Sequence, residues 1–254
     1  MSKAGWNPEQ YLKFERQRTQ PAVDLANRLR GRAFRRMADL GCGPGNSTQA
    51  LRSVFPEGEL VGIDQSPEML EKARKKHPQL SFRLGDVRGL EGGWDLLFSN
   101  ACLQWVPDHE ALLPQLMGKL NEGGALAVQI PRNGGEPFFQ IIDQVAAGPQ
   151  WGFDRESLEK NGALSPQEYY NILSRCSRDF DLWETVYCHS MPSRQAMLEW
   201  VRSTRLRPYL AALDEERAAA FQREILERAA QAYPAMEDGS VLFRFRRLFF
   251  VAYR

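Results

Sequence analysis

Residues 37–46 constrain the fold more than any other part of this chain. An apolar run ends in the acid Asp39, and glycines follow at positions 41, 43 and 45. Because glycine reaches positive φ at little cost and has no Cβ, such a segment can turn tightly against a ligand. Residues 46–48, Asn-Ser-Thr, offer side-chain caps for a helix that begins there. A strand, a glycine turn and a helix N-terminus together predict a ligand cradle in an α/β sheet.

Three classes of cofactor use a turn of this kind, and the neighbouring residues separate them. A phosphate-binding P-loop needs a lysine after its glycines, whereas no lysine occurs between Lys13 and Lys72. The dinucleotide fingerprint needs a small residue where Asn46 stands. The remaining pattern, Asp-x-Gly-x-Gly-x-Gly, resembles motif I of the class I methyltransferases, which bind S-adenosylmethionine (SAM). The acid Asp39 suits the positive charge of SAM, which it could contact directly or through water. The alternative is a glycine turn that binds no ligand.

A second predicted strand, over residues 60–63, also ends in an acid. Asp64 follows the glycine turn at about the separation of 20 residues that is expected for a ribose-binding carboxylate. A carboxylate can accept hydrogen bonds from two ribose hydroxyls. The alternative is that Asp64 caps the helix expected over 66–76, although Ser66 and Pro67 can begin this helix without it.

A third strand, expected over residues 81–84, is followed by Asp86 and Val87. In the methyltransferases that motif I resembles, this acid and the next amide meet the adenine edge. Three acids at the ends of successive strands would line the crevice in which open α/β sheets bind ligands.

The segment after the fourth strand, expected over 95–100, addresses the substrate. Methyltransferases that act on DNA amino groups carry an Asn/Asp-Pro-Pro-aromatic run there, whereas Asn100 is followed by Ala-Cys-Leu. With a net charge of +1, this sequence argues against a nucleic acid substrate. Trp105 either lines the active site or fills the core, and His109 is expected to cap a helix over 111–120. Gly123 and Gly124 are expected to end that helix before a fifth strand at 125–130.

The two ends of the chain supply candidate covers for the crevice. Trp6, Tyr11 and Phe14 suit a short amphipathic helix, which either packs on the sheet edge or closes over the cofactor with the Tyr11 hydroxyl as a contact. Helices are expected at 21–30, 137–147 and 166–176, and strands at 182–189 and 241–253. The forty or so residues from 193 to 233 read as a helical insert, and a hairpin between those strands needs far fewer. We therefore expect this insert to be a substrate cap.

Composition places the chain in a broad class. It has 254 residues, of which 43% are hydrophobic and 26% are charged, as is usual for a globular protein with a core. No apolar run reaches the length of a membrane span, and we see no signal peptide. The four cysteines show neither paired spacing nor a zinc pattern. We expect a cytoplasmic, metal-free protein with no membrane or nucleic acid partner.

Several segments together resemble one family along nearly the whole chain. They are Trp6-Asn7-Pro8-x-x-Tyr11, residues 38–48, Gly62-Ile63-Asp64-x-Ser66-Pro67-x-Met69, Leu103-Gln104-Trp105, His189-x-Met191-Pro192-Ser193 and Leu206-Arg207-Pro208. This set resembles the trans-aconitate 2-methyltransferases. The resemblance implies a Rossmann-like class I methyltransferase of the α/β class, with a seven-stranded, mostly parallel sheet, helices on both faces and a helical cap before the last strand. It implies one domain over residues 1–254, divided into a lid (1–35), a sheet core (36–192), a cap insert (193–238) and a last strand (239–254).

The resemblance also implies the cofactor and its site. The donor would be SAM, the product S-adenosylhomocysteine (SAH), and the acceptor a small anionic carboxylate. The cofactor-binding residues would be Asp39, Gly41, Cys42, Gly43, Gly45, Asp64, Gln65, Met69, Asp86, Val87 and Asn100.

A carboxylate acceptor would need no general base, because its reference pKa of about 4 leaves it ionised at neutral pH. Trp105 and Tyr11 would then only line the site. Arginine matches a carboxylate with two parallel hydrogen bonds, so arginines should hold the carboxylates that do not react. The candidates are Arg207, within Leu-Arg-Pro, and then Arg205, His189, Arg244, Arg246 and Arg132. For each of them a structural ion pair or a surface position is the alternative.

Three functions stay open at this point. The first is the carboxyl methyltransferase, and the second is a SAM-dependent enzyme of another small metabolite. An alcohol acceptor would need a base, for which His109 and His189 are the candidates. The third is a SAM-binding module without catalysis.

Overall fold

The computed structural model describes residues 15–154, 162–202 and 204–254, and these form two compact units. The first, here called the sheet unit, contains Arg18–Pro131, Asn161–Thr185 and Arg247–Arg254. The second, the helical unit, contains the described residues of 132–160 and 186–246 together with residues 15–17. Tyr11, Trp6 and Phe14, the predicted lid aromatics, lie outside the described residues.

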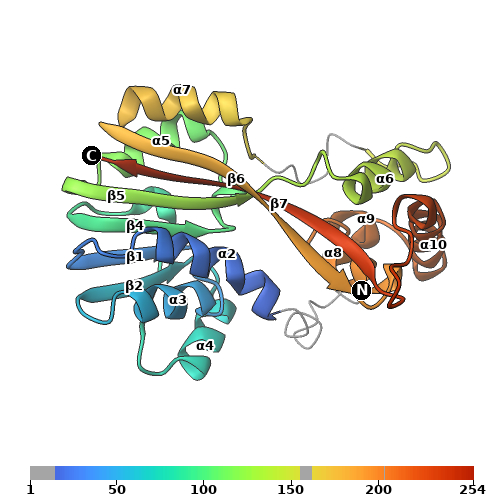
Figure 1. The fold of residues 1–254 in the computed structure, drawn as a ribbon, viewed down its shortest axis with the longest axis horizontal. Coiled ribbons are helices and arrows are strands. Elements are labelled where there is room, and N and C mark those ends of the chain that lie inside the picture. Colours follow the sequence, from blue (N-terminus) through green and yellow to red (C-terminus); the bar gives the residue numbers. More distant parts are fainter. Residues whose placement is uncertain (1–14, 155–161, 203) are drawn as a thin grey trace. The chain divides into compact units, whose positions relative to one another are not determined.

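The central feature is a seven-stranded sheet with the order β3-β2-β1-β4-β5-β7-β6 (Figure 1). Its strands are β1 Arg36–Leu40, β2 Glu59–Asp64, β3 Ser81–Leu84, β4 Trp94–Asn100, β5 Leu120–Pro131, β6 Asp179–Met191 and β7 Val241–Tyr253. The pairs from β3 to β5 are parallel, and β7 runs antiparallel to β5. The predicted fold class, a mostly parallel seven-stranded sheet with its helical insert before the last strand, is confirmed.

Helices cover both faces of the sheet unit (Figure 1). The helices α2 Glu15–Arg28, α3 Asn46–Val54 and α4 Pro67–Lys76 lie against one face, and α5 His109–Met117 and α7 Pro166–Cys176 against the other. Because side chains alternate along a strand, neighbouring residues serve different faces. Leu97 and Leu126 pack into the core with α5 and α7, while Phe98 and Ala127 point to the opposite face and are fully buried. Such doubly covered strands explain the continuous apolar runs in the sequence.

Several predicted boundaries differ from the structure: α2 begins at Glu15 rather than at residue 21, β5 begins at Leu120 rather than at 125, and β6 is longer than 182–189 at both ends. The helix expected over 111–120 is α5, which begins at His109 and ends at Met117, and Gly118 rather than Gly123 follows it as the C-cap. The chain leaves the helix early because Leu120 already pairs with Trp94 at the start of β4, and the Lys119 carbonyl accepts the Trp94 N–H. The strand pairing supplies hydrogen-bond partners for the backbone groups of residues 119 and 120, which the helix no longer includes.

The helical unit has a separate, aromatic core. It contains α6 Pro137–Ala146, α8 Arg194–Arg202, α9 Arg207–Ala211, α10 Glu215–Ala232 and the ends of β6 and β7 at 186–191 and 241–246. Phe138 and Phe243 lie edge to face with ring centroids 5.6 Å apart, and Trp200 and Phe221 are fully buried beside them. The predicted helices of the insert are present, and α6 shares their core. The division into lid, core, cap and last strand stays a prediction.

No helix in the described part of the chain combines the length and apolar character that a membrane crossing demands.

Candidate active site

The glycine turn after β1 has the conformation that its sequence predicts. Gly41, Gly43 and Gly45 all have positive φ, at 71°, 53° and 88°. A Cβ on Gly41 would lie 2.1 Å from Cys102 Sγ, so only glycine fits there. The N–H groups of Gly41 and Cys42 both donate to the Ile63 carbonyl, at 2.7 and 3.0 Å. The turn is thereby fastened to the end of β2.

The expected helix caps in this turn are absent. Gly45, in the left-handed conformation, is the N-cap of α3 and makes no side-chain cap bond. The hydroxyls of Ser47 and Thr48 instead donate to Asp39 Oδ2, at 2.7 and 2.6 Å. The acid of motif I therefore draws these hydroxyls away from the helix end, which is why the capping prediction fails.

Asp39 is fully buried, and one of its oxygens is left over. Oδ1 has no hydrogen-bond partner among the described residues. Burial raises the pKa of Asp39 from 3.8 to about 6, against the opposing effect of the bonds from Thr48 and Ser47. A buried oxygen that lacks a donor is expected to acquire one when a ligand with N–H groups binds.

Asp64 joins the glycine turn to the next helix. Its Oδ2 accepts the Gly43 N–H at 2.8 Å, and its Oδ1 accepts the Ser66 N–H at 2.9 Å. Ser66 is the N-cap of α4, since its hydroxyl accepts the Met69 N–H at 3.3 Å. The alternative that Asp64 itself caps α4 is therefore wrong. A carboxylate has about four acceptor positions, so two bonds leave capacity for ribose hydroxyls. Gln65, between β2 and α4, is exposed, and Met69, in the first turn of α4, is half-buried.

Asp86 lies after β3 as predicted, but it already has a partner. It is the N-cap of the short helix η1 Val87–Gly89, and its carboxylate pairs with Arg88 at 2.5 Å. The bond from the Arg88 side chain holds the pKa of Asp86 below its usual value. Val87 is buried. A contact with adenine would therefore have to share this carboxylate with Arg88.

The sequence interpretation missed Gln129. This residue is fully buried in β5, next to Asn100 of β4 in the register, and neither atom of its amide has a described hydrogen-bond partner. The Asn100 Oδ1 is buried without a described partner as well. Register neighbours on parallel strands share a face. One amide within the apolar run 125–130 is the signal that could have identified this residue.

The turn after β4 is braced and carries Trp105. The short helix η2 Leu103–Trp105 follows Ala101, whose φ is 54° and whose carbonyl accepts the Gln104 side chain at 2.7 Å. Trp105 is 47% exposed, which excludes the core-filling alternative. His109 is not the cap of α5, because Asp108 caps it.

His109 is instead buried between two fixed partners. Its Nε2 lies 2.8 Å from the Leu103 carbonyl and its Nδ1 lies 2.7 Å from the Tyr169 hydroxyl. A carbonyl only accepts, so Nε2 carries a proton, and in the neutral ring Nδ1 then accepts from Tyr169. This histidine ties η2 to α7, and both of its nitrogens are occupied.

The candidate arginines of the helical unit are in different situations. Arg205 pairs with Asp143 and lies over the Tyr209 ring. Arg207 is exposed at the first residue of α9. The His189 ring stacks on Trp200 with centroids 5.0 Å apart. For Arg205, the alternative of a structural ion pair is therefore supported by its contact with Asp143.

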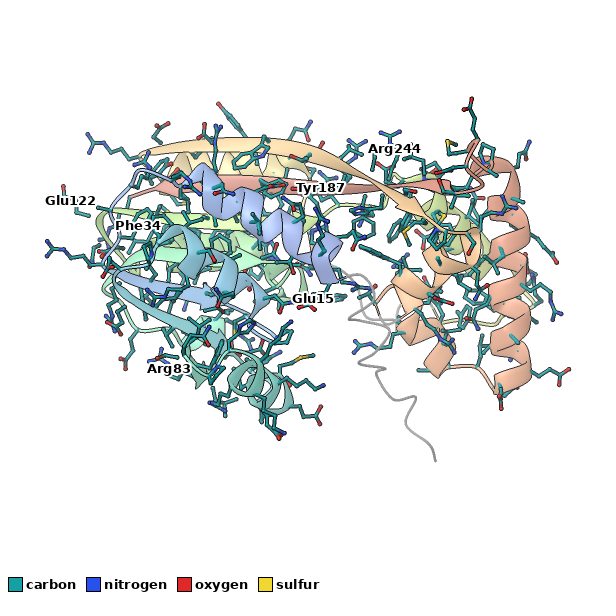
Figure 2. All side chains as sticks on the ribbon, turned by 60° about the horizontal axis from the view of Figure 1, so that its bottom comes forward. Glu15, Phe34, Arg83, Glu122, Tyr187 and Arg244 are labelled. Carbon is teal, nitrogen blue, oxygen red and sulfur yellow. The ribbon has the colours of Figure 1, made fainter. Side chains whose placement is uncertain are left out.

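The remaining two candidates share one counter-ion. Arg244 and Arg246 lie on the same side of β7, and both face the carboxylate of Glu136. The Arg244 Nε lies 3.9 Å from Oε2, and the Arg246 Nε lies 3.2 Å from Oε1. Arg244 projects outward from the strand (Figure 2). The Arg132 N–H donates to the Arg246 carbonyl at 3.0 Å.

Comparison with known proteins decides the family. Residues 37–124 match the methyltransferase domain family. The chain is 43% identical to the trans-aconitate 2-methyltransferase of Methylobacterium radiotolerans, over 98% of each chain. It is 44% identical to the protein of the same name from Agrobacterium fabrum, over 97% of this chain and 98% of that one. The protein belongs to the trans-aconitate 2-methyltransferase family.

Solved structures support the fold of this family member at lower identity. The YcgJ protein of Bacillus subtilis superposes with a TM-score of 0.60 at 12% identity, over 92% of this chain and 98% of that one. Phosphoethanolamine N-methyltransferase 2 of Haemonchus contortus, solved with SAH, gives a TM-score of 0.53 at 16% identity. The match covers 92% of this chain and 52% of that one. Within residues 15–154, 162–202 and 204–254, no three His, Cys, Asp or Glu side chains gather as a metal site.

Proposed function

We propose that this protein transfers the methyl group of SAM to a carboxylate of trans-aconitate and releases the methyl ester and SAH. The observation that carries the proposal is the identity of more than 40% with trans-aconitate 2-methyltransferases over nearly the whole of both chains. The acids at the ends of β1 and β2, joined through the glycine turn, support SAM as the donor.

The donor would lie along the carboxyl ends of β1, β2 and β4. Its ammonium group would supply the hydrogen-bond donor that Asp39 Oδ1 lacks, and its ribose would use the remaining acceptor positions of Asp64. Bound in this way, the positively charged ammonium group of the cofactor would lie beside the carboxylate of Asp39. The floor beneath the amino-acid end of SAM would then be formed by Gly41, Cys42, Gly43 and Gly45.

The transfer needs alignment rather than acid–base chemistry. A carboxylate oxygen attacks the methyl carbon in line, the carbon–sulfur bond breaks, and its electron pair neutralises the sulfonium. No proton moves, because the acceptor is already ionised at neutral pH. Measurements on intramolecular reactions suggest that such alignment can contribute roughly 7–11 kcal/mol. The protein's task is to hold two anionic groups of the acceptor while the third reacts.

Arginines of the helical unit are the proposed carboxylate ligands. Arg207 stays the first candidate, because it is exposed and lies within the Leu-Arg-Pro segment. Arg244 and Arg246 form a pair on one strand and are the second. Arg205 ranks lower, since Asp143 already neutralises it.

A base-dependent reaction on an alcohol is less well supported. Both nitrogens of His109 are occupied by the Leu103 carbonyl and the Tyr169 hydroxyl. General-base catalysis needs a nitrogen within hydrogen-bond reach of the acceptor. His189 would have to serve alone, and its ring is stacked on Trp200.

Incubation with radiolabelled SAM and a panel of tricarboxylates tests the proposal. Base-labile label on trans-aconitate is the expected result. Label on another acid would show that this acid, and not trans-aconitate, is the substrate. SAH binding without any transfer would favour a SAM-binding module without catalysis. A cytoplasmic location and the lack of a nucleic acid or membrane partner belong to the same proposal.

A further inference from the structure

Gln129 is a fully buried polar side chain that the fold does not use for its own hydrogen bonds. Neither its amide oxygen nor its amide nitrogen has a partner among residues 15–154, 162–202 and 204–254. Its chain neighbours Val128 and Ile130 point to the other face of the sheet and belong to the apolar core there. Burying an amide without partners destabilises a fold, because the hydrogen bonds to water are lost. Packing therefore does not explain why a glutamine stands in this apolar strand.

The amide belongs to a row of unpartnered polar atoms on one face of the sheet unit. Asp39 of β1 lies beside Phe98 of β4 in the register, and Phe98 lies beside Ala127 of β5. Two residues further along the strands, Asn100 lies beside Gln129. Because side chains alternate along a strand, Asp39, Asn100 and Gln129 share one face. The Oδ1 atoms of Asp39 and Asn100 are buried without a partner among the described residues as well.

The position of Gln129 in this row favours the methyl acceptor over the donor. The acids proposed to hold SAM, Asp64 and Asp39, end β2 and β1, and the sheet continues from β1 to β4 and β5. Gln129 lies two strands and two residues beyond Asp39, which separates their Cα atoms by about 12 Å. The amino-acid end of SAM carries its ammonium and its carboxylate on one carbon. If the ammonium lies at Asp39, the carboxylate beside it is far from Gln129.

The row ends at Gln129 and is open to solvent beside it. The next residue across the sheet is Phe249 of β7, which is apolar and buried. Asn100 and Pro131, at the carboxyl ends of β4 and β5, are both partly exposed. A ligand that lies over these strand ends would therefore have the Gln129 amide as its last polar contact on the sheet.

The chemistry of an amide suits an anionic acid at this place. A carboxylate only accepts hydrogen bonds, so it would meet the Nε2 atom, which carries two N–H groups. Hydrogen bonds to a charged group are stronger than those between neutral groups. A neutral amide can also be buried in the ligand-free protein at a lower cost than a lysine or arginine, which would need a counter-ion there.

We propose that Gln129 is a substrate-binding residue whose Nε2 donates to a carboxylate of the acid that accepts the methyl group. This inference rests on the proposed function, and it adds a neutral ligand to the arginines named above. Gln129 contributes binding and alignment, and no proton moves.

Steady-state kinetics and SAH binding of Gln129→Met test the proposal. Methionine keeps the approximate size of the side chain and removes both hydrogen-bonding atoms. We expect the KM for trans-aconitate to rise about tenfold or more, the effect of losing one hydrogen bond to a charged group. The Kd for SAH should stay unchanged. Gln129→Asn keeps the amide but withdraws it from the ligand, so it should raise the KM in the same direction and carries the test if Gln129→Met fails to fold.

Gln79→Met is the matched control, because it makes the same change at an exposed amide. Gln79 precedes β3 and donates to the Gln49 side chain, at the amino ends of the strands. This variant should leave the KM and the Kd for SAH unchanged. A wild-type KM in Gln129→Met overturns the proposal and leaves the amide a structural role. Weaker binding of SAH by Gln129→Met also overturns it, because the amide would then serve the donor.

Equilibrium binding of trans-aconitate in the presence of SAH separates this proposal from the proposed reaction. If wild-type protein does not turn over but binds the acid more tightly than Gln129→Met, the reaction fails and the role of Gln129 stands. If both proteins turn over with the same KM, the reaction stands and the role of Gln129 fails. If the acid does not bind to wild-type protein at all, both fail.

Discussion

Replacing Asp39 by asparagine should remove the pH dependence that this buried acid imposes on stability. Its pKa lies at about 6 in the folded protein and at 3.8 in the unfolded reference, mainly because of burial. The folded state therefore binds a proton more tightly than the unfolded chain. The stabilising contribution is complete below pH 3.8 and is lost as the pH rises through 6. The difference between the pKa of 3.8 and that of about 6 corresponds to about 3 kcal/mol of stability.

The measurement is urea unfolding of ligand-free wild-type protein and Asp39→Asn between pH 4 and 7.5. Asparagine is nearly isosteric and stays neutral, so all other titrating groups cancel in the difference. Relative to wild type, the free energy of unfolding of Asp39→Asn should increase by about 2.5 kcal/mol across this range, because at pH 4 the unfolded chain is already partly ionised at this position. A difference that is flat, or that falls with pH, would refute the reasoning.

The same acid should couple SAH binding to proton release. If the donor ammonium lies at Asp39 Oδ1, it favours the ionised carboxylate. Near pH 6 about half of the free protein carries this proton, so binding should release about half a proton. Calorimetry in buffers of different ionisation enthalpy measures this number. Asp39→Asn should release none, and equal release by both proteins would exclude the contact.

Three further substitutions test the site. Asp64→Ala should weaken SAH binding about 100-fold, because it removes two proposed charge-assisted ribose bonds and the bond that holds Gly43; calorimetric Kd values within threefold of wild type would contradict this. Gln129→Met should leave the ligand-free melting temperature unchanged or higher, because the buried amide has no described hydrogen-bond partner; a lower melting temperature would show that the amide stabilises the fold. Arg207→Ala should raise the KM for trans-aconitate about tenfold or more by removing a charge-assisted pair, with the SAH Kd unaltered; an equal loss of affinity for SAH would move Arg207 to the cofactor.

The sheet and the glycine turn were predictable because their signals are local. Among the parallel strands, β1, β2, β4 and β5 each contain a short apolar run, and the glycines at 41, 43 and 45 have the positive φ that their spacing indicates. The ends of α7 and β7 agree with the sequence prediction for the same reason, since Ser165 caps α7 and Pro166 begins it. Local chemistry alone determines these boundaries.

The partners of polar side chains were not predictable, because they come from distant segments. Ser47 and Thr48 look like helix caps in the sequence, but the buried Asp39 offers them a stronger acceptor. His109 meets Tyr169 sixty residues later in the chain. Glu136 and the β7 arginines are more than a hundred residues apart. No periodicity links such positions, so only the folded chain shows which charges are already paired.

The brace around His109 has a consequence for how the turn after β4 is ordered. The hydrogen bonds have a single direction: the Leu164 N–H points to the Tyr169 oxygen, the Tyr169 hydroxyl to Nδ1, and Nε2–H to the Leu103 carbonyl. The imidazole is therefore locked in one tautomer, which nitrogen-15 spectra would report as a single form. Tyr169 lies in the first turn of α7, so a segment remote in sequence contributes, through His109, to the support of the short helix that carries Trp105.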